Sequence, residues 1–136
     1  MPKFFVKLLF VLCGFFINSP KATEQVTIQM LLEKGIVVIE TYPDKAPKTV
    51  KRITELINQG FYDGLTFHRV ISGFMAQGGD PAGNGTGGSG KNIIAEFNDI
   101  KHERGIVSMA RSNDPDSADS QFFICYDSHP FLDGKY

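Results

Sequence analysis

Apolar and polar residues alternate along several short stretches of this chain, which predicts a protein built mainly of β-strands. Residues 25–32 alternate in this way, and residues 36–41 form a second run that is rich in β-branched residues. The turn Glu33-Lys34-Gly35 separates the two runs. Because this connection is short, we expect the two strands to pair as an antiparallel hairpin.

The next segment has the spacing of a helix. Pro47 suits the first turn of a helix, and Gly60 suits the position that follows the last turn. The apolar residues between them recur every three to four positions: Val50, Ile53, Leu56 and Ile57. We therefore expect one amphipathic helix here, with its polar side in solvent.

Three further strands are expected, at residues 67–71, 106–110 and 121–126. A glycine-rich loop at residues 78–90 and a polar loop at residues 111–120 separate them. Short strands, one clear helix and long loops predict a single domain with a β-barrel or sandwich and an added helix.

The N-terminal residues have the layout of a secretory signal. Lys3 and Lys7 precede an apolar run at residues 8–17, and a polar stretch then leads to Ala22. The run is shorter than the roughly 20 residues of a membrane-spanning helix. We expect residues 1–22 to be removed and residues 23–136 to act outside the cytoplasm, in a bacterial periplasm, without a stable membrane domain. An uncleaved N-terminal anchor is the alternative.

Charge and cysteine content limit the possible partners. The formal net charge is −1, and it becomes −4 once residues 1–22, with three lysines and no acidic residue, are removed. Such a chain gives no reason to expect nucleic acid as a partner. Removal of Cys13 would leave Cys125 alone in a strand, which favours a buried structural role. His102 and His129 have no partner at a metal-ligand spacing, so we expect neither a metal nor a cofactor.

One arginine lies in an unusual setting. On an extended segment Phe67, Arg69 and Ile71 share one face, which places a guanidinium beside apolar neighbours. Such a position is costly unless the cation has a task. Arg69 is therefore the first candidate for a functional residue.

The glycine-rich loop also contains two nucleotide-binding patterns. Residues 83–88 match GxGxxG, and residues 85–92 come within one residue of a P-loop. Both motifs need a preceding buried strand and a following long helix, because the helix N-terminus holds the phosphate. Neither is expected here, so we interpret the loop as the wall of a different site.

Seven ordered motifs resemble those of the cyclophilins, which are peptidyl-prolyl cis-trans isomerases. The resemblance runs from about residue 27 to residue 136. The motifs are Phe67-His68-Arg69-Val70-Ile71, Gly73-Phe74-Met75, Gln77-Gly78-Gly79-Asp80, Gly85-Thr86-Gly87-Gly88, Ser108-Met109-Ala110, Ser120-Gln121-Phe122-Phe123-Ile124 and Leu132-Asp133-Gly134-Lys135.

The resemblance implies a mainly β fold, an eight-stranded antiparallel barrel capped by two helices. This chain ends inside the last motif, and family domains continue for about thirty residues. We therefore expect a cyclophilin-like barrel with one capping helix that is incomplete, with open strand edges and an exposed apolar wall.

The resemblance also assigns the site. Arg69 corresponds to the catalytic cation, and Gln77 and Gln121 to polar groups that hold the peptide; from their spacing, we expect Gln77 to hydrogen-bond Arg69. Ala110 and Arg111 align with a pair that binds the peptide backbone. The proline ring is expected in a pocket of Phe74, Met75, Phe123 and Leu132, completed by Phe131 and Tyr136.

Phe131 stands where many members have a tryptophan that donates to cyclosporin. Phenylalanine has no donor, so we expect weak cyclosporin binding. The implied function is isomerisation of X–Pro bonds in folding polypeptides, by a monomer whose partners are proline-containing chains. The alternative is a binding or chaperone module that holds proline peptides without catalysis.

Overall fold

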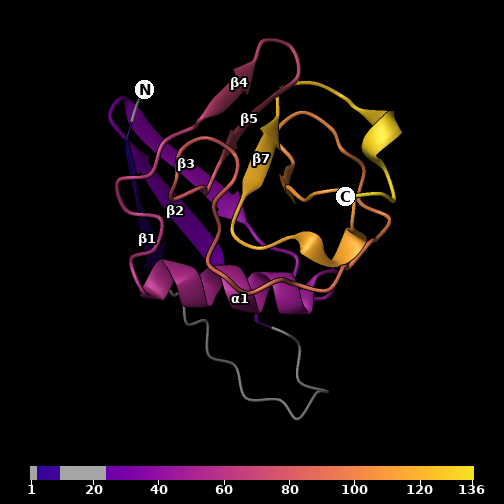
Figure 1. The fold of residues 1–136 in the computed structure, drawn as a ribbon, viewed down its shortest axis with the longest axis horizontal. Helices are drawn as coiled ribbons and strands as arrows, with labels where there is room; N and C mark the ends of the chain where they lie inside the picture. Colours follow the sequence, from indigo (N-terminus) through magenta and orange to yellow (C-terminus); the bar gives the residue numbers. More distant parts are fainter. Residues whose placement is uncertain (1–2, 10–23) are drawn as a thin grey trace.

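The computed structural model describes residues 3–9 and 24–136. Two antiparallel sheets lie side by side, and the helix α1 runs across one end of them (Figure 1). The sheet orders are β1-β2-β3 and β4-β5-β7-β6. The elements are β1 (Phe4–Leu9), β2 (Thr27–Leu32), β3 (Gly35–Glu40), α1 (Pro47–Asn58), β4 (Arg69–Ile71), β5 (Met75–Gly78), β6 (Val107–Met109), the 3-10 helix η1 (Pro115–Ser117), β7 (Phe122–Cys125) and the 3-10 helix η2 (Pro130–Leu132).

The expected hairpin is confirmed. β2 and β3 pair antiparallel along their whole length, from Thr27 opposite Glu40 to Leu32 opposite Gly35. On its other edge β2 pairs with β1, which lies within the segment predicted as a signal. The rest of that segment, residues 1–2 and 10–22, lies outside the described residues, so the signal and its removal stay predictions.

The expected helix is confirmed as α1. Gly60 has a φ of +70°, and this left-handed conformation ends the helix just after Gln59 at the C-cap. No local side chain caps the other end; instead the Glu96 carboxylate accepts from the backbone N–H groups of Lys48 (2.9 Å) and Thr49 (2.8 Å). A distant carboxylate therefore fixes where the helix starts.

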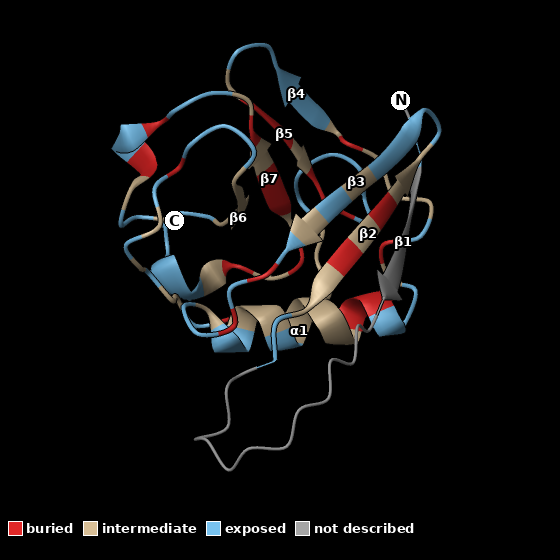
Figure 2. Cartoon of the chain, turned by 180° about the vertical axis from the view of Figure 1, so that it is seen from behind, coloured by how far each residue is buried: buried red, intermediate tan, exposed pale blue. Residues whose placement is uncertain are grey.

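Alternation along β5 and β7 divides the apolar side chains between two cores. Both strands are largely buried (Figure 2). Phe122 faces the larger core together with residues of β2 and α1, whereas its neighbour Phe123 faces the smaller core. The buried members of the larger core are Ile28, Met30, Leu56, Ile57, Tyr62, Phe67, Ala76 and Phe122. Those of the smaller core are Met75, Phe123, Cys125 and Leu132.

Arg69 lies at the surface of the protein. Phe67 is buried in the larger core, but Arg69 is exposed, as are Val70 and Ile71. β4 is an edge strand of its sheet and pairs only with β5 in the described chain. Because all of β4 is exposed, the cost of burying a guanidinium, which singled out Arg69 in the sequence, does not apply.

Among the described strands, β3 pairs only with β2 and β6 only with β7, so the strands do not close into a barrel. An apolar cavity of about 650 Å³ opens between the sheets and α1, with walls that include Met30, Ile53, Met109, Phe122 and Ile124. The glycine-rich loop is followed by irregular chain and not by a long helix. No helix in the described residues is long and apolar enough to cross a membrane.

Candidate active site

The strand register places the candidate cation in a row that crosses the second sheet. Arg69 lies opposite Gln77, Gln77 opposite Phe123, and Phe123 opposite Ser108. Directly opposed residues in antiparallel strands project to the same face. The row therefore carries a cation, a carboxamide, an aromatic ring and a hydroxyl in that order, from the edge strand β4 to the other edge at β6.

A chain of carboxamides orients the guanidinium. Gln121 Nε2 donates to the carbonyls of Gly87 (2.8 Å) and Gly85 (3.1 Å), so its Oε1 is the atom that accepts from Gln77 Nε2 (2.9 Å). Gln77 Oε1 is then turned to Arg69 and accepts from Nη1 at 3.2 Å. The hydrogen bond expected between Gln77 and Arg69 is present, and each amide orientation follows from the carbonyls at the far end of the chain.

Beside this chain lies a cluster of apolar side chains. Met75, Phe123 and Leu132 are its buried members, and Phe74 and Tyr136 pack against them. The Tyr136 ring meets the edge of the Phe123 ring at a centroid distance of 5.9 Å. These residues, predicted as the proline pocket, come from β5, β7 and the segment around η2, and the fold brings them together.

His129 supports one wall of the pocket. Its buried ring packs edge-on against the Phe74 ring at 4.8 Å, and Nε2 lies 2.8 Å from the Phe74 carbonyl. A carbonyl only accepts, so Nε2 must carry the proton. Phe131 continues this wall at 6.0 Å from Phe74 and is 59% exposed, so its ring faces solvent at the rim.

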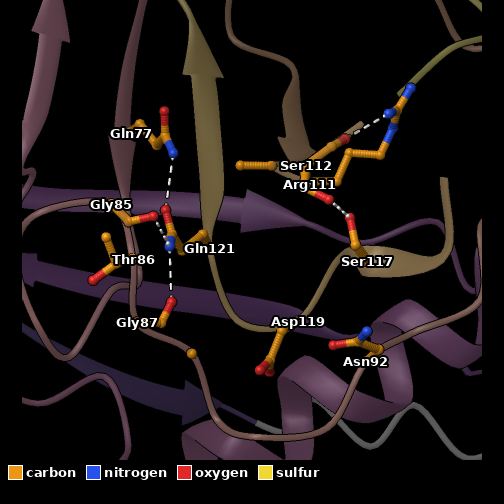
Figure 3. A pocket seen from close by; sticks show the side chains of 12 residues that line it. Gln77, Gly85, Thr86, Gly87, Asn92, Arg111, Ser112, Ser117, Asp119 and Gln121 are labelled. Atoms are coloured by element: carbon orange, nitrogen blue, oxygen red, sulfur yellow. Dashed lines mark hydrogen bonds between the residues drawn. The ribbon is translucent and has the colours of Figure 1, made fainter. Parts of the chain in front are cut away.

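A polar pocket of about 340 Å³ adjoins the carboxamide chain (Figure 3). Gln77 and Gln121 form one side, and Ala110, Arg111 and Asp119 contribute to the rest. Ala110 donates its backbone N–H to the Gln121 carbonyl at 2.9 Å, which joins the end of β6 to the start of β7.

The Arg111 side chain is turned toward the last residues of the chain. Its Nε and Nη2 donate to the Lys135 carbonyl at 3.2 and 2.7 Å, and its guanidinium lies 4.4 Å from the centre of the Tyr136 ring. Arg111 therefore holds Tyr136 against Phe123 through a cation–π contact. That bracing role was not predicted from the sequence.

Asp80 shapes the glycine-rich loop beneath the carboxamide chain. Its buried carboxylate accepts from the backbone N–H groups of Ala82 and Asn84 at 2.8 and 3.0 Å, and from that of Gly85. Burial acts to raise the pKa of Asp80, but these N–H groups outweigh it and hold the pKa below its ordinary value. The ionised carboxylate thus sets the position of the Gly85 carbonyl that Gln121 uses.

Other polar residues near the pocket were missed as contributors. His102 and His129 were considered only as metal ligands, and Asp133 only as a member of the last motif. The contacts of His102 with Asp133 and of His129 with Phe74 span 31 and 55 residues in sequence, so no local pattern could have revealed them. In the described residues no group of three or more His, Cys, Asp or Glu side chains is placed to hold a metal.

Comparison with known proteins agrees with the motifs. The family model described as "Cyclophilin type peptidyl-prolyl cis-trans isomerase/CLD" matches residues 26–136. The chain is 51% identical over 104 residues to a peptidyl-prolyl cis-trans isomerase of Synechococcus elongatus, covering 76% of this chain and 71% of that protein. It is also 51% identical over 109 residues to peptidyl-prolyl cis-trans isomerase B of Bacillus subtilis, covering 78% of this chain and 76% of that protein.

Solved structures agree on the fold. A cyclophilin type peptidyl-prolyl cis-trans isomerase of Cryptosporidium parvum, crystallised in the presence of the dipeptide Ala-Pro, superposes with a TM-score of 0.77 at 37% identity. The match covers 81% of this chain and 73% of that one. A cyclophilin from Hirschia baltica matches with a TM-score of 0.69 at 33% identity, covering 76% and 58%.

The chain therefore combines a mainly β fold, an exposed cation held by a carboxamide chain and a cluster of apolar rings. This chain belongs to the cyclophilin-type peptidyl-prolyl cis-trans isomerases. The family and the enzyme class that the motifs predicted are confirmed.

Proposed function

We propose that this enzyme accelerates rotation about X–Pro bonds in exposed segments of polypeptides, with Arg69 as its catalytic residue. The proline ring sits in the pocket floored by Met75, Phe123 and Leu132 while the preceding carbonyl swings. No covalent intermediate is needed, because the reaction only rotates a bond.

The chemistry explains why a guanidinium suits this task. Amide resonance gives the X–Pro bond a rotation barrier of about 18–20 kcal/mol. In the twisted transition state the nitrogen lone pair is no longer delocalised and can accept a hydrogen bond. Arg69 can donate to that nitrogen and to the proline carbonyl, so it binds the twisted state better than either planar isomer. Lowering the barrier by about 7 kcal/mol corresponds to roughly 10⁵-fold in rate.

The carboxamide chain that ends on Arg69 is the observation that carries this proposal. Gln77 Oε1 accepts from Nη1, which leaves the other guanidinium N–H groups to face a bound peptide. The Gln77 bond joins the cation to the sheet row that also holds Phe123. The crystal of the Cryptosporidium cyclophilin with Ala-Pro supports a short proline peptide as the ligand.

A protease-coupled assay on a short Ala-Pro peptide tests the proposal. Arg69→Ala should lower kcat/KM by about 10²–10³-fold, the size expected for losing one preorganised transition-state donor, and peptide binding measured by NMR titration should persist. Arg69→Lys should recover little, because an ammonium lacks the planar fork. Arg104→Ala is the matched control, since Arg104 is also exposed and donates to a backbone carbonyl, that of Tyr126.

The outcomes separate the two functions considered. Catalysis lost with binding kept identifies an enzyme that acts through Arg69. Peptide binding by the unmodified chain without any rate acceleration would instead identify a binding module.

The site of action is part of the proposal. The basic start and apolar run at residues 1–22 support export to a bacterial periplasm, where newly translocated chains present X–Pro bonds. Mass spectrometry of the protein purified from the periplasm would test this, because cleavage near Ala22 is expected.

A further inference from the structure

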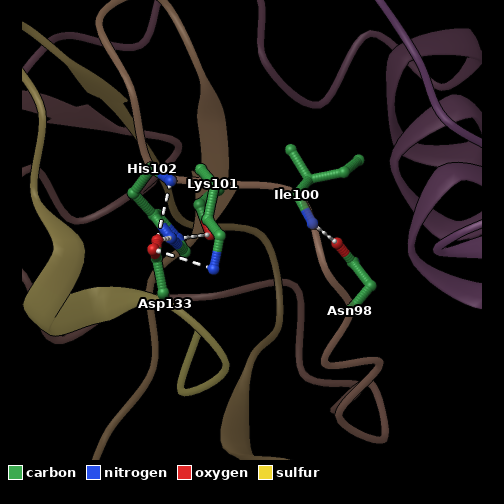
Figure 4. Close-up of polar contacts among 6 residues, drawn as sticks. Asn98, Ile100, Lys101, His102 and Asp133 are labelled. Carbon is green, nitrogen blue, oxygen red and sulfur yellow. Dashed lines mark hydrogen bonds and ion pairs between the residues drawn. The ribbon is translucent and has the colours of Figure 1, made fainter.

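A histidine behind the apolar pocket is held at both ring nitrogens. The His102 side chain is 4% exposed, its Nδ1 lies 3.1 Å from Asp133 Oδ1, and its Nε2 lies 3.2 Å from Ser108 Oγ. The backbone N–H of His102 donates to the same Asp133 oxygen at 2.8 Å (Figure 4). Two in-plane contacts fix both the position and the plane of the imidazole.

The charge on Asp133 decides how the ring is protonated. The backbone N–H of His102 is the main cause that holds the pKa of Asp133 below its ordinary value, and Lys101 Nζ, 3.5 Å from Oδ2, acts in the same direction. An ionised carboxylate only accepts, so Nδ1 carries a proton and donates to Asp133, while Nε2 pairs with the Ser108 hydroxyl.

The clamped ring is the support of Phe123. The two rings stack at a centroid distance of 6.2 Å and an interplanar angle of 15°, and Tyr136 meets Phe123 edge-on from another side. Ser108, which holds Nε2, is the residue opposite Phe123 in the β6–β7 register. His102 thus stands at one end of the row that has Arg69 at its other end.

Asp133 also connects the η2 segment, a second part of the pocket, to His102. Asp133 follows Leu132 at the end of η2, and the His102 carbonyl accepts from the His129 N–H just before η2 at 2.8 Å. Two hydrogen bonds in opposite directions therefore tie the η2 segment to the backbone of His102. His102 therefore holds both Leu132 and Phe123, which belong to different parts of the pocket.

We propose that His102 is a positioning residue for the isomerase site, which sets the plane of Phe123 and the place of Leu132 relative to Arg69. The proposal rests on the proposed role of that pocket. The Ser108–His102–Asp133 connectivity resembles that of a hydrolase triad, but at 4% exposure His102 is closed to an acyl substrate. The cluster acts through Phe123 and does not touch the peptide.

If Phe123 shifts, the proline ring that rests on it moves, and the proline nitrogen is displaced from the Arg69 guanidinium. Small misplacements of reacting groups lower the rate strongly. An apolar pocket that has shifted still binds an apolar ring. We therefore expect loss of His102 to lower the isomerisation rate of bound peptide, measured by NMR exchange, about tenfold. The dissociation constant of the peptide should change less than about threefold.

Two amide variants separate the contribution of the Asp133 contact from that of the Ser108 contact. His102→Asn keeps a donor where Nδ1 stands and loses the Ser108 contact, whereas His102→Gln places its amide where Nε2 stands and loses Asp133. Neither supplies a flat ring behind Phe123, so both should slow the reaction and shift the Phe123 ring resonances. Asp133→Asn retains an oxygen acceptor for both His102 N–H groups and should keep the rate within about twofold, whereas Asp133→Ala should behave like His102→Asn.

Leu56→Val controls for stability, because Leu56 is buried in the other core. It should lower the melting temperature and leave both the rate on bound peptide and the Phe123 resonances unchanged. Should the His102 variants fail to fold, Ser108→Ala, which releases only Nε2, carries the test with the same readouts.

The proposal is overturned if the folded variants keep both the wild-type rate and the wild-type Phe123 resonances. It is also overturned if their losses match those of Leu56→Val at equal stability. Absence of isomerase activity in the unmodified chain would remove the proposed function alone. The effect of His102 on Phe123 would then be decided by the resonances, where a shift supports the positioning role and no shift contradicts it.

Discussion

The two faces of β7 stabilise the molecule in different ways. Phe122 and Ile124 face the larger core, where side chains from β2, β3 and α1 meet around an apolar cavity of about 650 Å³. Phe123 and Cys125 face the smaller core, which is bordered by hydrogen-bonded histidine, glutamine and aspartate side chains. Neighbouring residues of one strand therefore belong to two kinds of environment.

The difference teaches what a catalytic face needs. Burial of apolar surface is not directional, so the larger core can stabilise the fold while one of its walls stays open. In the proposed function a proline ring must instead be held at a defined place relative to Arg69, and direction comes from hydrogen bonds. The smaller core has few buried side chains, but polar side chains that are themselves hydrogen-bonded contact several of its rings.

The largest effects are expected from replacing the two neighbouring phenylalanines. Phe122→Ala should lower the free energy of unfolding by about 3 kcal/mol, at the lower end of the range for a buried ring because the cavity already adjoins it. Phe123→Ala should cost less stability but weaken Ala-Pro peptide binding at least tenfold, because it removes the pocket floor. Urea unfolding measures the stability of each variant, and NMR titration measures its peptide binding. Equal effects of the two variants on binding would contradict the different roles of the two faces of β7.

The carboxamide chain allows a second test of the difference between the two faces. Gln77→Leu removes the acceptor that holds Arg69, and a hydrogen bond to a charged group contributes about 1.5–3 kcal/mol. We expect kcat/KM to fall at least tenfold while the urea midpoint changes little. Gln59→Leu is the control, since Gln59 is exposed at the end of α1. A stability loss in Gln77→Leu equal to its loss of catalysis would show that the chain serves the fold rather than the cation.

The sequence predicted the elements that depend on local patterns. The β2–β3 hairpin and α1 followed from alternation, Pro47 and Gly60, and the ordered motifs identified the family. The exposure of Arg69 could not be predicted, because alternation indicates which residues share a face but not whether that face is covered. All three residues of β4 are exposed.

The side-chain hydrogen bonds that hold α1 and the smaller core could not be predicted from the sequence, because they join distant residues. Glu96 caps α1 from 47 residues away, and Asp133 reaches His102 across 31 residues. The row from Arg69 to Ser108 depends on the register of four strands, which becomes known only once the sheet has formed. Side chains that act through other side chains leave no periodic signal.

Acid should loosen the catalytic face. Asp80 and Asp133 both have a pKa below the ordinary 3.8 in the folded protein: for Asp80 backbone N–H groups outweigh burial, and for Asp133 the His102 N–H is the main cause. A depressed folded-state pKa gives stability that is present above about pH 4 and is lost as the pH falls through the folded value. Peptide binding and unfolding free energy should hold from pH 7 to about 5 and decline below 4.

Charge removal tests the origin of this decline. Asp133→Asn should flatten part of the slope below pH 4 because it removes one of the two carboxylates. Asp44→Asn, at an exposed position outside both cores, should leave the slope as it is. A pH profile of unfolding that is the same in Asp133→Asn and in the unmodified chain would show that this carboxylate does not contribute.

The smallest effect on function is expected from changes in the apolar cavity. Its walls include Val37 and Ile53, and an apolar dye such as anilinonaphthalene sulfonate should bind there. Val37→Thr and Ile53→Thr should weaken dye binding a few-fold without altering isomerase activity, whereas Val70→Thr, on the exposed strand β4, should change neither. Saturating Ala-Pro peptide should not displace the dye, because Phe122 and Phe123 project to opposite sides of β7. Competition between the two ligands would mean that cavity and proline pocket communicate, and the two faces would then have to be treated as one site.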